Sequence, residues 1–266
     1  MADCSDTVVV CQAEGRANVT ARCSSVRRQP ETAITARSES RGALHLPLSR
    51  DATHERQLKA KPLSLQEISD LTLKDYDQSA EGFRDGTRAH DVSQNVQALL
   101  RHIEGTPPFR ILDLGCGPGR DLKTFAALGH VPIGLDGAVN FVEMARRETG
   151  CEVWHQAFLS LQLPDASFDG IFANASLQHV PSSELPRVLR ELRATLKRGG
   201  VLFSSIPRGD NEEGWNRGRY SAYHDVETWQ RFMTSAGFVE LEHYFRPPGL
   251  PREQQPWLAS VWRRPS

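Results

Sequence analysis

From Pro62 onward, apolar residues recur at spacings that alternate between those of helices and those of strands. Within 63–83 and again within 90–103, they recur every three or four positions, which predicts two helices. The second helix must end before Pro107-Pro108, since proline cannot continue a helix. The regular part of the chain therefore begins with two helices.

Beyond these helices, short apolar runs alternate with longer amphipathic segments. This alternation is typical of βαβ units, which build a largely parallel sheet with helices on both faces. The predicted strands are 109–114, 131–136, 151–156, 168–174, 201–206, 238–245 and 257–263. The predicted helices between them are 121–129, 138–150, 182–200 (stopped by Gly199-Gly200) and 225–238. The sequence thus predicts an α/β fold with a Rossmann-like, doubly wound sheet.

Residues 1–62 lack this periodicity. They are rich in Ser, Thr, Ala and Arg and poor in aromatic residues, which is typical of disorder. Abundant Arg and Ser also fit an organelle-targeting peptide, but such peptides are acid-poor. The acidic residues that argue against targeting are Asp3, Asp6, Glu14, Glu31 and Glu39. We expect a disordered or targeting extension at 1–62 and a single domain at 63–266.

Composition and charge narrow the function classes. The chain has 266 residues, 39% hydrophobic and 24% charged, with a formal net charge of -1. This balance suits a globular domain and gives no reason to expect a nucleic-acid groove. No apolar stretch approaches the roughly 20 residues of a membrane span. The five cysteines form no CxxC pair, so we expect no metal site and a reducing, cytoplasmic location.

The stretch LDLGCGPGRDL, residues 112–122, places three glycines directly behind the first predicted strand. Ligands of open α/β sheets bind outside the carboxyl ends of the strands. Gly115 and Gly117 allow a ligand to approach the main chain, and Gly119 lets the next helix start close to the strand. Cys116 between them is expected there for its small size. This turn is therefore a candidate cradle for a cofactor.

Two acidic residues define which cofactor this turn would take. Asp113 precedes the glycines, and a carboxylate there repels a pyrophosphate but accepts hydrogen bonds from an ammonium group. Asp136 ends the next strand, where a carboxylate can bind both hydroxyls of a ribose. The glycine spacing is G-x-G-x-G rather than the dinucleotide fingerprint G-x-G-x-x-G. An amino-acid head, a ribose and no phosphate together describe S-adenosylmethionine.

Four motifs in order carry a family resemblance: ILDLGCGPGRDL, GLDGAVNFVEMAR, LPDASFDGIFANASLQHVP and LRELRATLKRGGVLF. With them, the chain resembles class I S-adenosylmethionine-dependent methyltransferases, specifically the small-molecule kind similar to ubiquinone-biosynthesis methyltransferases. The resemblance implies a seven-stranded sheet whose last strand runs antiparallel, formed by a hairpin of 238–245 with 257–263. It also implies that the helices of 63–105 cover the cofactor.

When the family's functional positions are matched to this sequence, the resemblance implies a set of cofactor-binding residues. Asp113 and the three glycines would hold the methionine part, Asp136 and Gly137 the ribose, and 156–158 the adenine. Asn174 would lie near the sulfonium, Tyr76 would cover the cofactor and Arg88 would reach its carboxylate. The complete set is Tyr76, Arg88, Asp113, Gly115, Cys116, Gly117, Gly119, Asp136, Gly137, Gln156, Ala157, Phe158 and Asn174.

One position departs from the family pattern. Relatives usually carry an acidic residue where this chain has Ala157, and that acid would accept a hydrogen bond from the adenine amino group. Its loss would weaken cofactor binding by roughly 1–3 kcal/mol unless Gln156 or main-chain groups replace it. A catalytically silent binding module is therefore an alternative to an enzyme. A nicotinamide-dependent oxidoreductase is a third interpretation, which the glycine spacing disfavours.

The acceptor side has two candidate elements. His179 follows the fourth strand, where it would deprotonate the acceptor, although it could instead only shape the pocket. Residues 207–225 are predicted to form a loop covering a small-molecule acceptor, and its arginines hint at an anionic one. Its candidate contacts are Arg208, Trp215, Tyr220, Tyr223 and His224. We expect direct in-line methyl transfer, with the atom methylated and the oligomeric state left open.

Overall fold

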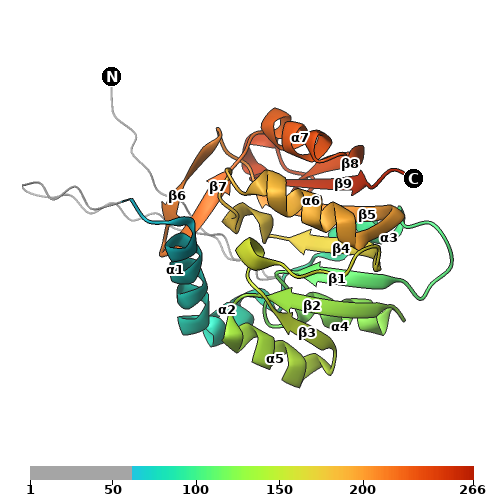
Figure 1. Cartoon of the computed structure of the whole chain (residues 1–266), viewed down its shortest axis with the longest axis horizontal. Coiled ribbons are helices and arrows are strands. Elements are labelled where there is room, and N and C mark those ends of the chain that lie inside the picture. Colours follow the sequence, from blue (N-terminus) through green and yellow to red (C-terminus); the bar gives the residue numbers. More distant parts are fainter. Residues whose placement is uncertain (1–61) are drawn as a thin grey trace, which may run out of the picture. The chain divides into compact units, whose positions relative to one another are not determined.

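The computed structural model describes residues 62–266. The expectation for the N-terminal extension therefore lies outside the described residues, apart from Pro62. Seven strands of the described part form one sheet in the order β3-β2-β1-β4-β5-β9-β8 (Figure 1). Their bounds are β1 Arg110–Leu114, β2 Val131–Asp136, β3 Glu152–His155, β4 Phe168–Asn174, β5 Leu196–Pro207, β8 Val239–Arg246 and β9 Trp257–Arg263.

All strands of the sheet run in the same direction except β9, which is the last strand in the sequence. β1 pairs in parallel with β2 and β4, while β9 runs antiparallel between β5 and β8. The predicted α/β class, the seven strands and the antiparallel last strand are confirmed. In consequence β8 points the same way as β5, so its carboxyl end lies at the same edge of the sheet as the glycine turn after β1.

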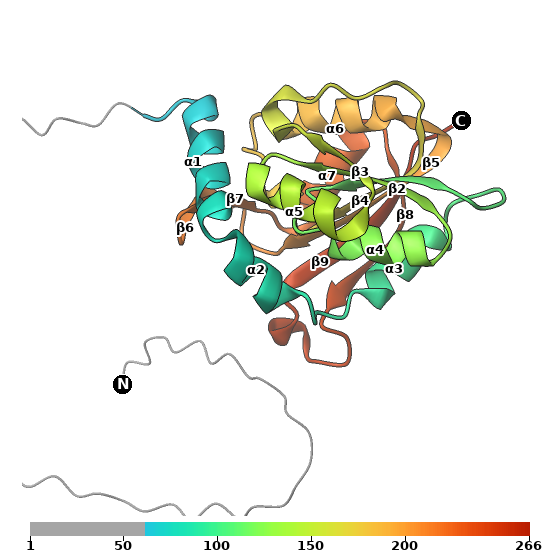
Figure 2. The same cartoon turned by 90° about the horizontal axis from the view of Figure 1, so that it is seen from below.

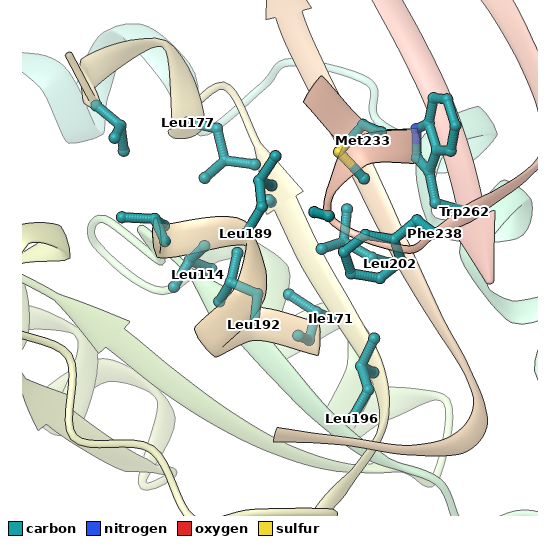
Figure 3. Close-up of a cluster of buried hydrophobic side chains, with 14 of the residues drawn as sticks. Leu114, Ile171, Leu177, Leu189, Leu192, Leu196, Leu202, Met233, Phe238 and Trp262 are labelled. Carbon is teal, nitrogen blue, oxygen red and sulfur yellow. The ribbon is translucent and has the colours of Figure 1, made fainter. Parts of the chain in front are cut away.

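Helices cover both faces of the sheet, as predicted (Figure 2). On one face lie α3 (Ser93–Leu100), α4 (Arg120–Ala127) and α5 (Val139–Thr149); on the other lie α6 (Leu185–Thr195) and α7 (Val226–Ser235). Figure 3 shows the core beneath α6 and α7, where Leu189, Leu192 and Met233 pack on the sheet residues Ile171 and Leu202. Burying this apolar surface fixes the sheet that positions the glycine turn.

Two predicted helix boundaries are wrong. The segment 63–83 forms two helices, α1 (Leu65–Gln78) and α2 (Ala80–Thr87), because Ser79 leaves the helical path and donates through its hydroxyl to Asp75 O. Helix α6 ends at Thr195 and not at Gly199-Gly200. Leu196 instead pairs with Phe168 and begins β5, so tertiary pairing overrides the glycine signal.

The segment 207–225 also differs from the expected irregular loop. It contains a two-stranded antiparallel hairpin, β6 (Glu212–Asn216) and β7 (Arg219–Tyr223). Three single turns of 3-10 helix complete the described elements: η1 (Phe158–Ser160), η2 (Leu177–His179) and η3 (Arg252–Gln254). Within 62–266, the helices are all too short or too polar to cross a bilayer.

The hairpin and α1 lie side by side beyond the carboxyl edge of the sheet (Figures 1 and 2). The Arg219 guanidinium donates to the Asp75 carboxylate at 2.6 Å and to the Ser79 hydroxyl at 2.9 Å. The Tyr220 amide donates to the Thr72 hydroxyl at 3.1 Å. These bonds join α1 and β7 into one cover over the edge where the parallel strands end.

Candidate active site

A cavity of about 600 Å³ lies beneath this cover. Its lining comes from the glycine turn, the ends of β2, β4 and β8, and helices α1, α2 and α5. Nine of the residues predicted from the sequence line it: Tyr76, Gly115, Cys116, Gly117, Asp136, Gly137, Phe158, Asn174 and His179. The structure therefore gathers residues spread over more than 100 sequence positions at one edge of the sheet.

The glycine turn exposes main chain to the cavity. Gly115 has φ of +74°, and a Cβ there would lie 2.5 Å from Ser176 Cβ. Gly117 has φ of +52°, and a Cβ there would meet no atom nearer than Phe83 at 3.9 Å. Gly119 faces away from the cavity, because its added Cβ would collide with Thr149 on α5. Two glycines therefore shape the cradle, while the third lets α4 start against α5.

Asp136 is held rigidly at the end of β2. One carboxylate oxygen accepts from the Gly117 amide and the other from the Ala138 amide, both at 2.9 Å. Burial raises the pKa of this carboxyl to about 6, against the lowering effect of these amide bonds. The carboxylate thus ties the glycine turn to β2 and retains lone pairs on the cavity side.

Asp113 lies behind the glycine turn and does not line the cavity. Its side chain is buried, and its Oδ2 has no hydrogen-bond partner within residues 62–266. Burial, followed by the charge of nearby Asp121, raises the pKa of Asp113 well above its usual value. The Ser176 hydroxyl, which does line the cavity, is likewise buried without a partner in the described chain. A buried polar atom without a partner is costly, so the Ser176 hydroxyl marks a place in the cavity where a polar ligand group would be favoured.

A polar network borders the cavity on the β4 side. The Asn95 amide donates to Asn174 Oδ1 at 3.0 Å, and the Tyr244 hydroxyl donates to Asn95 Oδ1 at 2.9 Å. The Arg120 guanidinium binds both carboxylate oxygens of Asp121, at 2.7 and 2.8 Å. Asn95, Arg120 and Asp121 all line the cavity, and none was predicted from the sequence. Arg120 and Asp121 follow the glycines directly, so position alone could have suggested them.

Aromatic rings form the cover above the cradle. The ring centroid of Tyr76 lies 5.6 Å from those of both Phe83 and Phe141, and these three rings come from α1, α2 and α5. The guanidinium of Arg219 lies 3.9 Å from the Tyr76 ring centroid, which is the geometry of a cation–π contact. The predicted cover by Tyr76 therefore includes two further aromatic residues and a cation from the hairpin.

His179 is partly buried, and both of its ring nitrogens are hydrogen-bonded. Its Nδ1 lies 2.7 Å from the Tyr220 carbonyl oxygen, and its Nε2 lies 2.7 Å from the Tyr76 hydroxyl. Because a carbonyl can only accept, Nδ1 carries the proton and Nε2 accepts from Tyr76. Burial lowers the pKa of His179 to about 4, so the imidazole is neutral at physiological pH.

Several predicted residues lie away from the cavity lining. The Arg208 guanidinium donates to the carbonyls of Gln255 and Arg252, and the Gln156 amide bonds the main chain of Gln162. His224 is buried against Trp229, whereas Trp215 is 45% exposed. Outside the lining altogether are Arg88, Asp113, Gly119, Gln156, Ala157, Arg208, Trp215, Tyr220, Tyr223 and His224. The hairpin thus contacts the site through the Tyr220 carbonyl rather than through its aromatic side chains.

The family comparison covers the part of the chain from β1 into β5, which includes the glycine turn. Residues 111–200 match the family model described as a methyltransferase domain. A malonyl-[acyl-carrier protein] O-methyltransferase of Erwinia pyrifoliae is 35% identical over 119 residues, 44% of this chain and 45% of the relative. A trans-aconitate 2-methyltransferase of an Azoarcus species is 37% identical over 130 residues, 47% of this chain and 49% of the relative. The chain therefore spans about half the length of these relatives.

Solved structures show the same fold at lower identity. The 1,6-didemethyltoxoflavin-N1-methyltransferase of Burkholderia thailandensis, solved with S-adenosylhomocysteine, superposes with a TM-score of 0.64 at 21% identity. The alignment covers 78% of this chain and 93% of that one. Residues 111–200 therefore resemble a methyltransferase domain, and the described chain shares the fold of this solved methyltransferase.

Proposed function

We propose that this chain transfers the methyl group of S-adenosylmethionine to a small-molecule acceptor. The observation that carries the proposal is the glycine cradle beside Asp136, which lines the same cavity as His179. When bound, the cofactor would supply an electrophilic methyl carbon on a sulfonium, with S-adenosylhomocysteine as the leaving group. The contribution of the protein is to hold and align both reactants.

The residues of the cradle fit this cofactor. Gly115 and Gly117 leave main chain open to the methionine part, and Asp136 offers its remaining lone pairs to the ribose hydroxyls. Ser176, which lines the cavity with its hydroxyl unpartnered, fits a nearby ammonium group, and the Asp113 carboxyl behind the turn would reach that group only through water. Arg120 lines the cavity and Arg88 does not, so Arg120, although paired with Asp121, is the arginine that we propose beside the methionine carboxylate. Phe158 and Gly137 also line the cavity and would border the adenine.

We assign His179 the role of general base. Its Nε2 lone pair faces the cavity, and the low pKa keeps it free of a proton at neutral pH. The Tyr76 hydroxyl occupies that lone pair in this structure, so it must give way to the acceptor or relay its proton. The Tyr220 carbonyl fixes the tautomer and stabilises positive charge when the ring accepts a proton.

The names of the relatives supply candidate acceptors. Those of Erwinia and Azoarcus are named for methylation of malonyl-[acyl-carrier protein] and of trans-aconitate, and both substrates carry a carboxyl group. A small-molecule acceptor also suits a cavity of about 600 Å³. We place the reaction in a reducing compartment such as the cytoplasm, since Cys116 and Cys151 are free thiols.

The test is methyl transfer by the purified full chain. The chain would be incubated with methyl-labelled S-adenosylmethionine and a panel that includes trans-aconitate, with S-adenosylhomocysteine and labelled product as readouts. The proposal expects acceptor-dependent formation of both. Cofactor binding without transfer to any acceptor of the panel, including acids, amines, phenols and thiols, would instead favour the silent binding module.

A further inference from the structure

The cavity has a second end, away from the cradle, that the cofactor residues do not account for. It lies where β8 ends and β9 begins, since Arg246 pairs with Trp257 across these strands. Arg246, Pro247 and Trp257 all line the cavity there. This end adjoins β5, because Trp257 also pairs with Pro207.

Arg246 is the charged group of this end. One of its terminal nitrogens donates to the Asp91 carbonyl at 2.7 Å, while its Nε is buried without a partner among the described residues. Within 62–266 it makes no salt bridge. The nearby Asp91 carboxylate accepts from the Ser93 amide instead. A guanidinium carries five N–H donors, so most of its hydrogen-bonding capacity is unused.

The other arginine of the cavity lining is already neutralised. Arg120 forms a two-pronged pair with Asp121 on the cradle side. The cavity therefore has Asp121 and Asp136 at the cradle, and at the far end Arg246, which makes no direct ion pair in the described chain although the Asp91 carboxylate lies nearby. Val92 and Trp257 provide apolar surface beside Arg246. A guanidinium with unused N–H donors beside apolar side chains matches a carboxylate on an apolar body.

We propose that the acceptor is an anion whose carboxylate binds to Arg246, an inference that rests on the proposed methyl transfer. The guanidinium orients the acceptor, and its apolar part lies against Trp257. This assignment replaces the anionic contacts expected from the hairpin. Arg208 and Arg219 are occupied by carbonyls and by Asp75, and neither lines the cavity.

The test measures ligand binding to the full chain saturated with S-adenosylhomocysteine. The probes are benzoate and trans-aconitate, with benzamide as the neutral match for benzoate and phenyl phosphate as the alternative oxyanion. The proteins are the wild type, Arg246→Gln, Arg246→Lys and, as a matched control, Arg217→Gln on the exposed hairpin turn. Titration calorimetry first establishes the affinity of each variant for S-adenosylhomocysteine, which also reports correct folding.

The proposal expects carboxylates to bind the wild type more tightly than benzamide. Arg246→Gln should weaken carboxylate binding on the order of 10- to 100-fold, with S-adenosylhomocysteine affinity unchanged. Arg246→Lys should be intermediate, because it keeps the charge without the fork, and Arg217→Gln should match the wild type.

Equal binding of benzoate and benzamide would overturn the proposal, as would an unaffected Arg246→Gln. The absence of carboxylate binding at millimolar concentration would do the same. Preference for phenyl phosphate would overturn the choice of carboxylate. Failure of the wild type to bind S-adenosylhomocysteine would count against the proposed function itself, so the two failures are distinguishable.

Discussion

The hydroxyl of Tyr76 lies 2.7 Å from Nε2 of His179, so α1 and the turn after β4 meet directly at the edge of the sheet. The Tyr220 carbonyl holds the opposite ring nitrogen. The cover and the proposed base therefore form one hydrogen-bonded unit, and entry of an acceptor must rearrange it. This arrangement gives His179 a defined tautomer before any ligand binds.

Substituting His179 by Gln tests its assignment as the base. We expect kcat to fall by roughly 10²- to 10⁴-fold with little change in cofactor affinity, since the imidazole contacts the acceptor side. Tyr76→Phe is the control, because it keeps the ring that covers the cradle and leaves Nε2 free. Steady-state methyl transfer measures both variants. A His179→Gln variant with nearly normal kcat would reduce the histidine to a residue that shapes the pocket.

The pKa of Asp136, about 6, predicts how cofactor binding depends on pH. Because the ionised carboxylate accepts the ribose hydroxyls, affinity is present above this pKa and is lost as pH falls through it. Between pH 7 and pH 5 the ionised fraction falls about tenfold, and affinity for S-adenosylmethionine should fall equally. Calorimetry across this window measures the slope. Asp136→Asn should bind weakly with no such slope, and an equally steep slope in that variant would assign the titration to another group.

Gly115 tests the steric account of the cradle. Gly115→Ala places a methyl group at positive φ and 2.5 Å from Ser176 Cβ, so strain and collision add. We expect a loss of about 2–5 kcal/mol in the free energy of unfolding. Gly129→Ala is the matched control, since Gly129 also has positive φ, +81°, but open space around its Cβ.

Denaturant unfolding of both variants separates the cost of backbone strain from the cost of the collision with Ser176. Gly129→Ala should cost only the strain, about 1–2 kcal/mol. Equal losses in the two variants would show that Ser176 does not limit the space at Gly115.

Ala157 tests the departure from the family pattern. The Gln156 amide is engaged with Gln162, so it does not supply the missing acceptor for the adenine amino group. Ala157→Asp should therefore raise the affinity for S-adenosylmethionine by roughly 10- to 150-fold. Comparison with Ala157→Asn, which matches the size without the charge, isolates the carboxylate. An unchanged affinity in the aspartate variant would mean that the adenine group lies elsewhere.

The cradle could be predicted from the sequence because its parts are local. Three glycines and Asp136 lie at the ends of adjacent parallel strands, and chain direction alone places such ends together. Asn95 and Arg246 could not be found in this way. Asn95 bonds Asn174 across 79 sequence positions. Arg246 reaches the cavity only because β9 runs antiparallel between β5 and β8, which leaves β8 pointing the same way as β5.

Residue types that often bind ligands were also misleading where the fold placed them away from the cavity. The segment 207–225 has the composition of an open loop. Within it, however, β6 and β7 pair as antiparallel strands, with Trp215 opposite Tyr220. Arg208 and His224 look like binding residues in the sequence. The first is instead hydrogen-bonded to nearby carbonyls, and the second is stacked on Trp229. Neither outcome has a local signal, since the partners come from other elements.

The most direct test of the account is titration calorimetry of the full chain with S-adenosylmethionine and, separately, with NAD. The account predicts micromolar binding of S-adenosylmethionine, loss of that binding in Asp136→Ala, and no binding of NAD. Binding of NAD instead, or binding of S-adenosylmethionine that survives Asp136→Ala, would contradict the assignment of the glycine cradle.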